Sequence, residues 1–302
     1  MVAHRYPRRR IWVAVLGAAL AACSAGGSAS PTGATQAATA PGTEVASAVP
    51  SAVAPVGLTI FGAASLKAAL AAVTTAYESS HRGVTLTVST DSSAALETQI
   101  EQGAPADVFL SADLSNPQKL LADGYASGAV VPFAGNLLTV IVPSGNPANV
   151  ASPADLARPG LKVVAAGDTV PITKYASQLI ANLAHEAGYP ADFAAAYAAN
   201  VVSKEDNVAA VVSKIALGEG DAAIVYVTDA RTSSQVTAIA VPSDANVPAT
   251  YGGVVVKASL QATAAATFLA WMAGPDGQSI LASFGFLPPS AVPTPSAVPT
   301  PS

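Results

Sequence analysis

Between residues 57 and 289, short apolar segments alternate with segments in which apolar residues recur every three or four positions. The apolar segment 58–62 is followed by apolar residues at spacings of four, three and four: Leu66, Leu70, Val73 and Tyr77. The first pattern is typical of a buried strand and the second of an amphipathic helix. Because the alternation continues along the chain, it predicts an α/β fold with mainly parallel sheets.

The expected elements follow from this pattern and from the residues that start and stop helices. We expect strands at 58–62, 84–89, 107–110, 137–142, 161–165, 201–202, 222–226, 236–241 and 252–256. We expect helices at 66–77, 93–100, 115–123, 208–215, 260–272 and 276–284, and one that begins at Pro171 and is ended by Gly188. In such sheets, ligands bind at the carboxyl ends of strands, beside helix N-termini.

The N-terminus has the pattern of an export signal. Four arginines within residues 1–10 precede an apolar run, 11–22, which is too short to span a membrane as a helix. The sequence Leu-Ala-Ala-Cys at 20–23 resembles the bacterial lipobox. The resemblance implies that residues 1–22 are a lipoprotein signal peptide, and that Cys23 is acylated after cleavage. Cys23 is the only cysteine, so an internal disulfide is excluded.

Two further segments have compositions that cannot bury a core. Residues 23–56 are mostly Ala, Ser, Gly, Thr and Pro, and this composition predicts a disordered tether between the lipidated cysteine and the fold. Residues 289–302 form a Pro/Thr repeat and predict a disordered tail. Removal of the signal leaves 10 basic against 19 acidic residues, which changes the net charge from −5 to −9. A protein this acidic is a poor nucleic-acid binder, so any anion site must use local dipoles.

Two serines stand where an expected strand ends and a helix begins, Ser65 in Ala-Ala-Ser-Leu and Ser93 in Asp-Ser-Ser-Ala. A helix start offers unpaired backbone N–H groups and the positive end of the helix dipole. Two such starts that face one cleft would bind a small oxyanion without a charged side chain. Each serine could equally be an ordinary N-cap, which is the commoner role of a serine at this position.

Signatures of catalysis are missing from the sequence. It has no Gly-x-Ser-x-Gly or Ser-x-x-Lys motif and no phosphate-binding loop. The three histidines, His4, His81 and His185, are far apart in sequence. Asp107 and Asp113 flank an expected strand as turn and cap residues. We therefore expect no enzyme, no catalytic residue, no cofactor and no bound metal of the protein's own.

Six segments together resemble the molybdate-binding proteins that serve ABC importers, across residues 58–287. They are Phe-Gly-Ala-Ala-Ser-Leu (61–66), the segment from Ser-Ser-Ala-Ala to Ser-Ala-Asp (92–113), Gly-Asn-Leu-Leu-Thr-Val-Ile-Val-Pro (135–143), Gly-Asp-Thr-Val-Pro (167–171), Ala-Ile-Val-Tyr-Val-Thr-Asp-Ala (223–230) and Phe-Leu-Ala-Trp-Met-Ala-Gly-Pro (268–275). The resemblance implies a two-lobed periplasmic-binding-protein fold of type II. Lobe one would be 57–137 plus 245–288 and lobe two 138–244, with a hinge of two strands near 137–142 and 236–241.

The resemblance also implies a site, position by position. The hydroxyls of Ser65, Ser93 and Tyr226 and the backbone N–H groups of Ile172 and Val208 would bind molybdate, and Ser92 is one register from Ser93. The only metal would be the molybdenum of that anion. The implied protein is a monomer, anchored by lipid at the extracytoplasmic face of the cell membrane. It would also bind tungstate and deliver the anion to an ABC permease and its ATPase. The alternatives are a receptor for sulfate or another small oxyanion, a lipid-anchored surface hydrolase, and a passive adhesin or scaffold.

Overall fold

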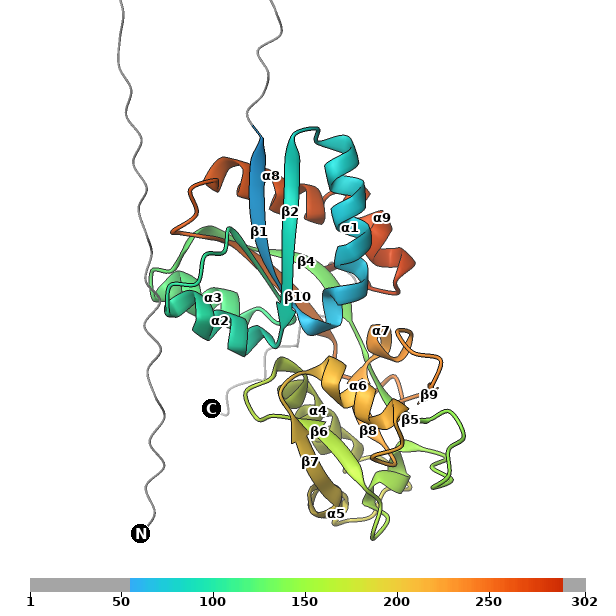
Figure 1. Cartoon of the computed structure of the whole chain (residues 1–302). Helices are drawn as coiled ribbons and strands as arrows, with labels where there is room; N and C mark the ends of the chain where they lie inside the picture. Colours follow the sequence, from blue (N-terminus) through green and yellow to red (C-terminus); the bar gives the residue numbers. More distant parts are fainter. Residues whose placement is uncertain (1–54, 290–302) are drawn as a thin grey trace, which may run out of the picture. The chain divides into compact units, whose positions relative to one another are not determined.

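The computed structural model describes residues 55–289, which form two groups of strands and helices (Figure 1). The expected signal peptide, Cys23, the tether up to residue 54 and the tail from residue 290 lie outside the described residues. No helix within 55–289 combines the length and the apolar character that crossing a membrane requires.

The larger group is built on a five-stranded sheet. Its strands, in spatial order, are β2 (Val84–Asp91), β1 (Val56–Ala63), β3 (Val108–Ser111), β10 (Ala249–Val256) and β4 (Ala126–Asn136). Strand β1 is parallel to β2 and β3, whereas β10 is antiparallel to β3 and β4. The accompanying helices are η1 (Ala64–Leu66), α1 (Lys67–Ser80), α2 (Ser93–Glu101), α3 (Ser115–Ala122), α8 (Ala262–Ala273) and α9 (Pro275–Ser283).

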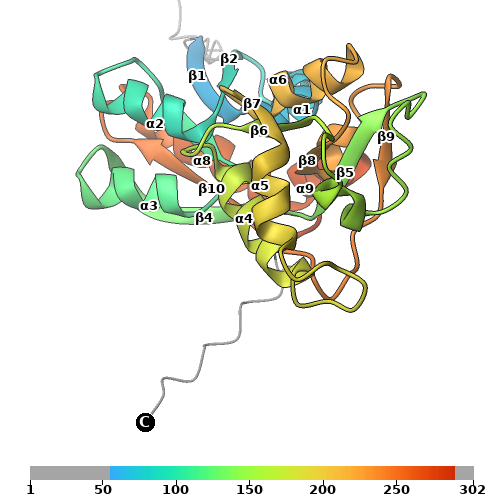
Figure 2. The same cartoon turned by 90° about the horizontal axis from the view of Figure 1, so that it is seen from below.

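Both faces of this sheet are covered by helices, because successive side chains of a strand point to opposite faces. On β1, Phe61 packs with Leu96 of α2 and Leu120 of α3. Its neighbour Ile60 belongs to the core on the opposite face, together with Val73 of α1. Helices α2 and α3 therefore share one face, where Figure 2 shows them together, and α1, α8 and α9 cover the other.

The smaller group contains two short sheets. Strand β5 (Leu138–Pro143) lies antiparallel between β8 (Ala223–Tyr226) and β9 (Val236–Ile239). Strands β6 (Val163–Ala166) and β7 (Val201–Glu205) are parallel. An isolated parallel β-bridge joins Val163 of β6 to Ala222, the residue before β8. The accompanying helices are η2 (Pro153–Ala157), α4 (Pro171–Leu183), α5 (Phe193–Asn200), α6 (Val208–Ala216) and α7 (Val227–Ala230).

One detail of the predicted sheets is wrong. The sheets are mixed rather than mainly parallel, because β10 and β5 each pair antiparallel with both neighbours. Strands β5 and β9, near which the two-strand hinge is expected, are antiparallel neighbours in one sheet, and the hinge stays a prediction. The chain crosses between the two groups at Leu137 and returns through residues 240–248. The division into lobe one and lobe two stays a prediction.

Candidate functional site

A small cavity lies where the two groups of elements meet. Its lining comes from the end of β1, the starts of α2, α4 and α6, and the end of β8: Ala63, Ala64, Ser65, Ser92, Ser93, Ala112, Val170, Pro171, Ile172, Val208 and Tyr226. The cavity is small: the centre of a water-sized sphere can occupy about 10 Å³ inside it, which is room for about one water-sized group. All five residues expected to bind a ligand line it.

Ser65 reaches the cavity because β1 turns directly into η1. At the nearby glycine, Gly62, a Cβ atom would lie only 2.4 Å from Leu70 Cδ1, so a larger residue there would displace the end of the Leu70 side chain that packs α1 on the strand. Ser65 is buried, and its Oγ lies 2.9 Å from the hydroxyl of Tyr251 on β10.

Ser92 and Ser93 have different roles. Ser92 is the N-cap of α2, and its Oγ accepts a hydrogen bond from the Ala95 N–H at 3.2 Å. Ser93 is fully buried, and its Oγ accepts from the Ala112 N–H at 3.0 Å. Because that N–H occupies a lone pair of Ser93, the hydroxyl hydrogen of Ser93 stays available to a ligand.

The starts of α4 and α6 contribute backbone donors. Pro171 is the first residue of α4 and Ile172 the second, and Val208 is the first residue of α6. The first N–H groups of a helix have no partner within the helix, and they carry the positive end of its dipole. The N-cap Asn207 secures α6, because its Oδ1 accepts from the Ala210 N–H at 3.0 Å.

Tyr226, at the end of β8, supplies the most informative atom of the cavity. Its side chain is 1% exposed, and its hydroxyl has no hydrogen-bond partner within residues 55–289. Burial raises the pKa of Tyr226 well above its usual value, so the hydroxyl keeps its hydrogen. A buried donor without a partner is unfavourable in a folded protein, and in a cavity it indicates a ligand that accepts its hydrogen bond.

The electrostatics favour an anion that is held without a counter-charge. None of the described residues that line the cavity is charged. Asp229 lies close behind it, where its buried Oδ2 accepts from the Tyr226 N–H at 3.2 Å. Burial raises the pKa of Asp229 to about 7, so this carboxyl is partly neutral at physiological pH. Within residues 55–289, no three His, Cys, Asp or Glu side chains are grouped as the ligands of a metal would be.

Comparison with known proteins identifies the family. The family model for bacterial extracellular solute-binding proteins matches residues 58–287. The chain belongs to this family. Over 233 residues it is 33% identical to the molybdate-binding protein ModA of Mycobacterium tuberculosis, in a match that covers 77% of this chain and 85% of that protein.

Two other similar proteins come from other bacteria. YvgL of Bacillus subtilis, whose name places it among ABC transporter substrate-binding lipoproteins, is 29% identical over 76% of this chain and 86% of its own. The solved periplasmic molybdate-binding protein of Azotobacter vinelandii is 24% identical over 76% of this chain and 98% of its own, with a TM-score of 0.65. The structural likeness confirms the predicted α/β fold, that of the type II periplasmic binding proteins.

The sequence pattern did not reveal the partners that orient the serines of this solute-binding protein. Tyr251 hydrogen-bonds to Ser65, and Asn136 hydrogen-bonds to Tyr251. Both lie in strands of the five-stranded sheet, far in sequence from the helix starts. The Gly-Asn-Leu segment at 135–137 belongs to the resemblance, and no spacing rule connects it to Ser65.

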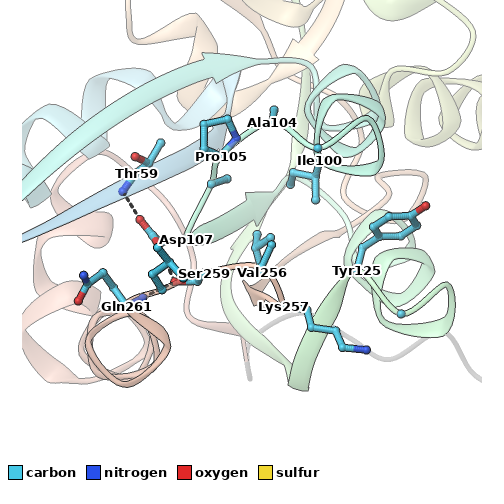
Figure 3. Close-up of a pocket in the computed structure, with 15 residues that line it drawn as sticks. Thr59, Ile100, Ala104, Pro105, Asp107, Tyr125, Val256, Lys257, Ser259 and Gln261 are labelled. Atoms are coloured by element: carbon cyan, nitrogen blue, oxygen red, sulfur yellow. Dashed lines mark hydrogen bonds between the residues drawn. The ribbon is translucent and has the colours of Figure 1, made fainter.

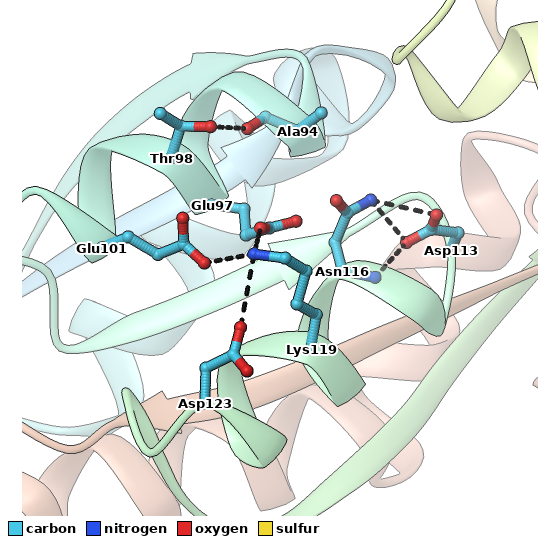
Figure 4. A network of polar contacts seen from close by, with 8 residues as sticks. All are labelled: Ala94, Glu97, Thr98, Glu101, Asp113, Asn116, Lys119 and Asp123. Carbon is cyan, nitrogen blue, oxygen red and sulfur yellow. Dashed lines mark hydrogen bonds and ion pairs between the residues drawn. The ribbon is translucent and has the colours of Figure 1, made fainter.

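The two aspartates expected to be structural make hydrogen bonds outside the cavity. Asp107 accepts from the Thr59 N–H at 2.7 Å and from the Ser259 hydroxyl, beside a larger hollow of about 570 Å³ that includes none of the five expected site residues (Figure 3). Asp113 accepts from the backbone and side chain of Asn116 at the start of α3 (Figure 4).

An ion-pair network fixes α2, and with it Ser93, against α3. Lys119 of α3 contacts Glu97 at 2.6 Å and Asp123 at 3.4 Å, and it also pairs with Glu101 (Figure 4). Burial raises the pKa of Glu97, while its hydrogen bond and ion pair with Lys119 oppose that shift. Lys119 is half exposed, and exposed ion pairs contribute little to stability. We therefore expect this network to position α2 rather than to stabilise the fold strongly.

Proposed function

We propose that this solute-binding protein captures molybdate, and also tungstate, outside the cytoplasm and delivers it to an ABC permease and its ATPase. The observation that carries the proposal is the unpartnered hydroxyl of Tyr226, among the described residues, in a small uncharged cavity that Ser65 and Ser93 also line. The name of the Mycobacterium tuberculosis relative supports molybdate as the anion. In this account the protein binds its anion unchanged and is not an enzyme.

The chemistry of the site suits a fully deprotonated oxyanion. Three hydroxyls and the backbone N–H groups of Ile172 and Val208 are all hydrogen-bond donors. A hydrogen bond to a charged acceptor contributes about 1.5–3 kcal/mol, so five of them reach submicromolar affinity after the costs of desolvation and ordering. The helix starts add favourable dipoles without an arginine or lysine.

The donors come from both proposed lobes. Ser65 and Ser93 belong to lobe one, and Ile172, Val208 and Tyr226 belong to lobe two. The anion would therefore bridge the lobes and stabilise their closure. A direct contact supports this arrangement, because Asn207 Nδ2 of α6 donates to Asp91 Oδ1 of β2 at 3.0 Å.

We propose further that the protein is a monomer attached to the cell membrane through acylated Cys23. The support is the lipobox-like sequence that ends in Cys23, together with the lipoprotein name of the Bacillus subtilis relative. The residues between Cys23 and the start of β1 at Val56 would then separate the lipid from the binding fold, and no part of the described structure would need to enter the bilayer.

Isothermal titration calorimetry of the full chain tests the function. We expect molybdate and tungstate to bind, and Ser65→Ala to weaken molybdate binding at least about tenfold, because one donor to a charged acceptor is lost. Ser79→Ala is the matched control, since Ser79 is exposed at the far end of α1 and its Oγ donates only to the Ala76 carbonyl in the same helix. Equal molybdate affinity for Ser65→Ala and wild type would remove Ser65 from the site. Tighter binding of sulfate than of molybdate would instead favour the alternative function, a receptor for sulfate or another small oxyanion.

A further inference from the structure

We propose that Asp91 and Asn207 form a latch across the entrance of the cavity, and that this latch sets how long the anion stays bound. The inference rests on the proposed function, because it concerns the release of the anion from the same site. It gives a favourable role to a carboxylate beside an anion site, where charge alone would oppose binding.

The latch is one hydrogen bond whose direction is fixed by its neighbours. Asn207 Oδ1 accepts from the Ala210 N–H at 3.0 Å, so the other atom of this amide is the NH₂ group. That group, Nδ2, donates to Asp91 Oδ1 at 3.0 Å. The same carboxylate oxygen accepts from the Ser92 N–H at 2.7 Å. Asp91 is thereby held at the start of α2 while it binds the N-cap of α6.

The bond lies at the edge of the cavity rather than inside it. Asp91 and Asn207 are both half-buried. The residue that follows each of them, Ser92 or Val208, is buried and lines the cavity. Asp91 also lines a wider hollow of about 760 Å³, which adjoins the cavity because Ser92 and Val170 line both. An anion that leaves through this hollow passes the latch.

The latch joins the two proposed lobes at a point remote from the crossing of the chain. Asp91 is the last residue of β2 in lobe one, and Asn207 precedes α6 in lobe two. Strand β2 is one edge of the five-stranded sheet, and β4, which leads to the crossing at Leu137, is the other edge. Four strand spacings, about 19 Å, therefore separate the latch from the crossing.

This distance decides what happens to the bond when the lobes separate. A second bond between the lobes, from Asn136 Nδ2 to Thr228 Oγ1 at 2.8 Å, lies directly beside the crossing, where a rotation moves the atoms least. At the opposite edge of the sheet, the same rotation moves the atoms furthest, so the bond between Asp91 and Asn207 has to break. The latch therefore stabilises the closed form alone.

A bond that exists only in the closed form acts on release. The anion enters while the lobes are apart, when Asp91 and Asn207 are not in contact, so the bond has little effect on association. It must break before the anion leaves, so its loss should speed dissociation. Charge alone predicts the opposite sign, because removal of a carboxylate near a bound anion lowers repulsion and should tighten binding.

The test measures how fast radioactive molybdate leaves the full chain during a chase with excess unlabelled molybdate. We expect Asp91→Ala to release molybdate about fivefold faster, with a matching loss of affinity in calorimetry and an unchanged association rate. Asp206→Ala is the matched control, since Asp206 is an exposed carboxylate that lines the same hollow. This control should not speed release.

A double-mutant cycle separates the latch from the start of α2, which Asp91 also supports. Asn207→Ser keeps the cap of α6 but is too short to reach Asp91, and we expect it to speed release about fivefold as well. The double variant, Asp91→Ala with Asn207→Ser, should release molybdate about as fast as either single variant, because both changes remove the same bond. Melting temperatures show whether each variant is folded.

The outcomes distinguish this inference from the proposed function. If wild type binds molybdate and folded Asp91→Ala releases it at the wild-type rate or more slowly, the latch is wrong and the function stands. If the two single effects multiply in the double variant, the residues act separately and the inference is again overturned. If wild type does not bind molybdate, the proposed function fails, and the inference fails with it.

Discussion

At the scale of single residues, two buried polar groups at the cavity lower the stability of the ligand-free protein. The Tyr226 hydroxyl is buried with no partner in the described part of the chain, and Asp229 is a buried carboxyl directly behind it. Both groups lost their hydration on folding without full compensation, which is unfavourable. A buried polar group of this kind is retained where it serves ligand binding. We therefore predict a separate effect on stability for a substitution at each of the two residues.

Tyr226→Phe should raise stability and lower affinity together. Removing the unpartnered hydroxyl should raise the free energy of unfolding of the ligand-free protein by roughly 1 kcal/mol, because the cost of burying it disappears. Molybdate affinity should fall at least about tenfold, because a donor to a charged acceptor is lost. Urea unfolding and calorimetry measure the two effects. A variant less stable than wild type would show that the hydroxyl has a partner in the ligand-free protein.

Asp229→Asn should make stability less sensitive to pH. Burial raises the pKa of Asp229 from 3.8 to about 7, so the unfolded chain releases this proton at a lower pH than the folded protein. Wild-type stability should therefore fall by about 1.4 kcal/mol per unit as the pH rises between those two values, and be unaffected by this group outside them. The asparagine side chain of the variant keeps an oxygen for the Tyr226 N–H. The stability difference between variant and wild type should grow from about pH 4 to about pH 7 in urea titrations; a constant difference would contradict the burial of an ionising carboxyl.

At the scale of elements, the site depends on how four helices begin. The sequence predicted helices that begin near the cavity at residues 66, 93, 171 and 208, and α1, α2, α4 and α6 begin within one residue of these positions. The caps differ from the expectation, because Ser92 rather than Ser93 caps α2, and no side chain caps η1. The sequence did not predict β4, in which residues 127–132 are exposed or half-buried, include Gly128 and Pro132, and show no clear alternation. Helix α5 was also missed, because its Ala-rich sequence has little periodicity.

Asn207→Ala tests the start of α6. The cap bond to the Ala210 N–H and the bond to Asp91 would both be lost. We expect a loss of about 1 kcal/mol in stability and weaker molybdate binding, because the Val208 N–H is held less firmly. Asn207→Ser is the matched control, since serine keeps the cap but cannot reach Asp91. If both variants bound molybdate as wild type does, α6 would not be part of the site.

At the scale of the whole molecule, one cavity gathers residues that lie far apart in the sequence, from Ala63 to Tyr226. The alternation of strands and helices predicted the α/β class, and the similarity to known proteins confirms the type II fold. The antiparallel strands β10 and β5 were not predictable in this way, because a buried apolar strand has the same pattern in either direction. The hydrogen-bond network from Asn136 to Ser65 was hidden for a related reason: it depends on which strands become neighbours.

The most direct test of the central claim is a crystal structure of the full chain grown with molybdate, with anomalous scattering measured at the molybdenum absorption edge. The account predicts one strong molybdenum peak in the cavity lined by Ser65, Ser93 and Tyr226, with the Tyr226 hydroxyl at hydrogen-bonding distance from an oxygen of the anion. A molybdenum peak elsewhere, such as the hollow beside Asp107, with the Tyr226 hydroxyl still unpartnered, would contradict it.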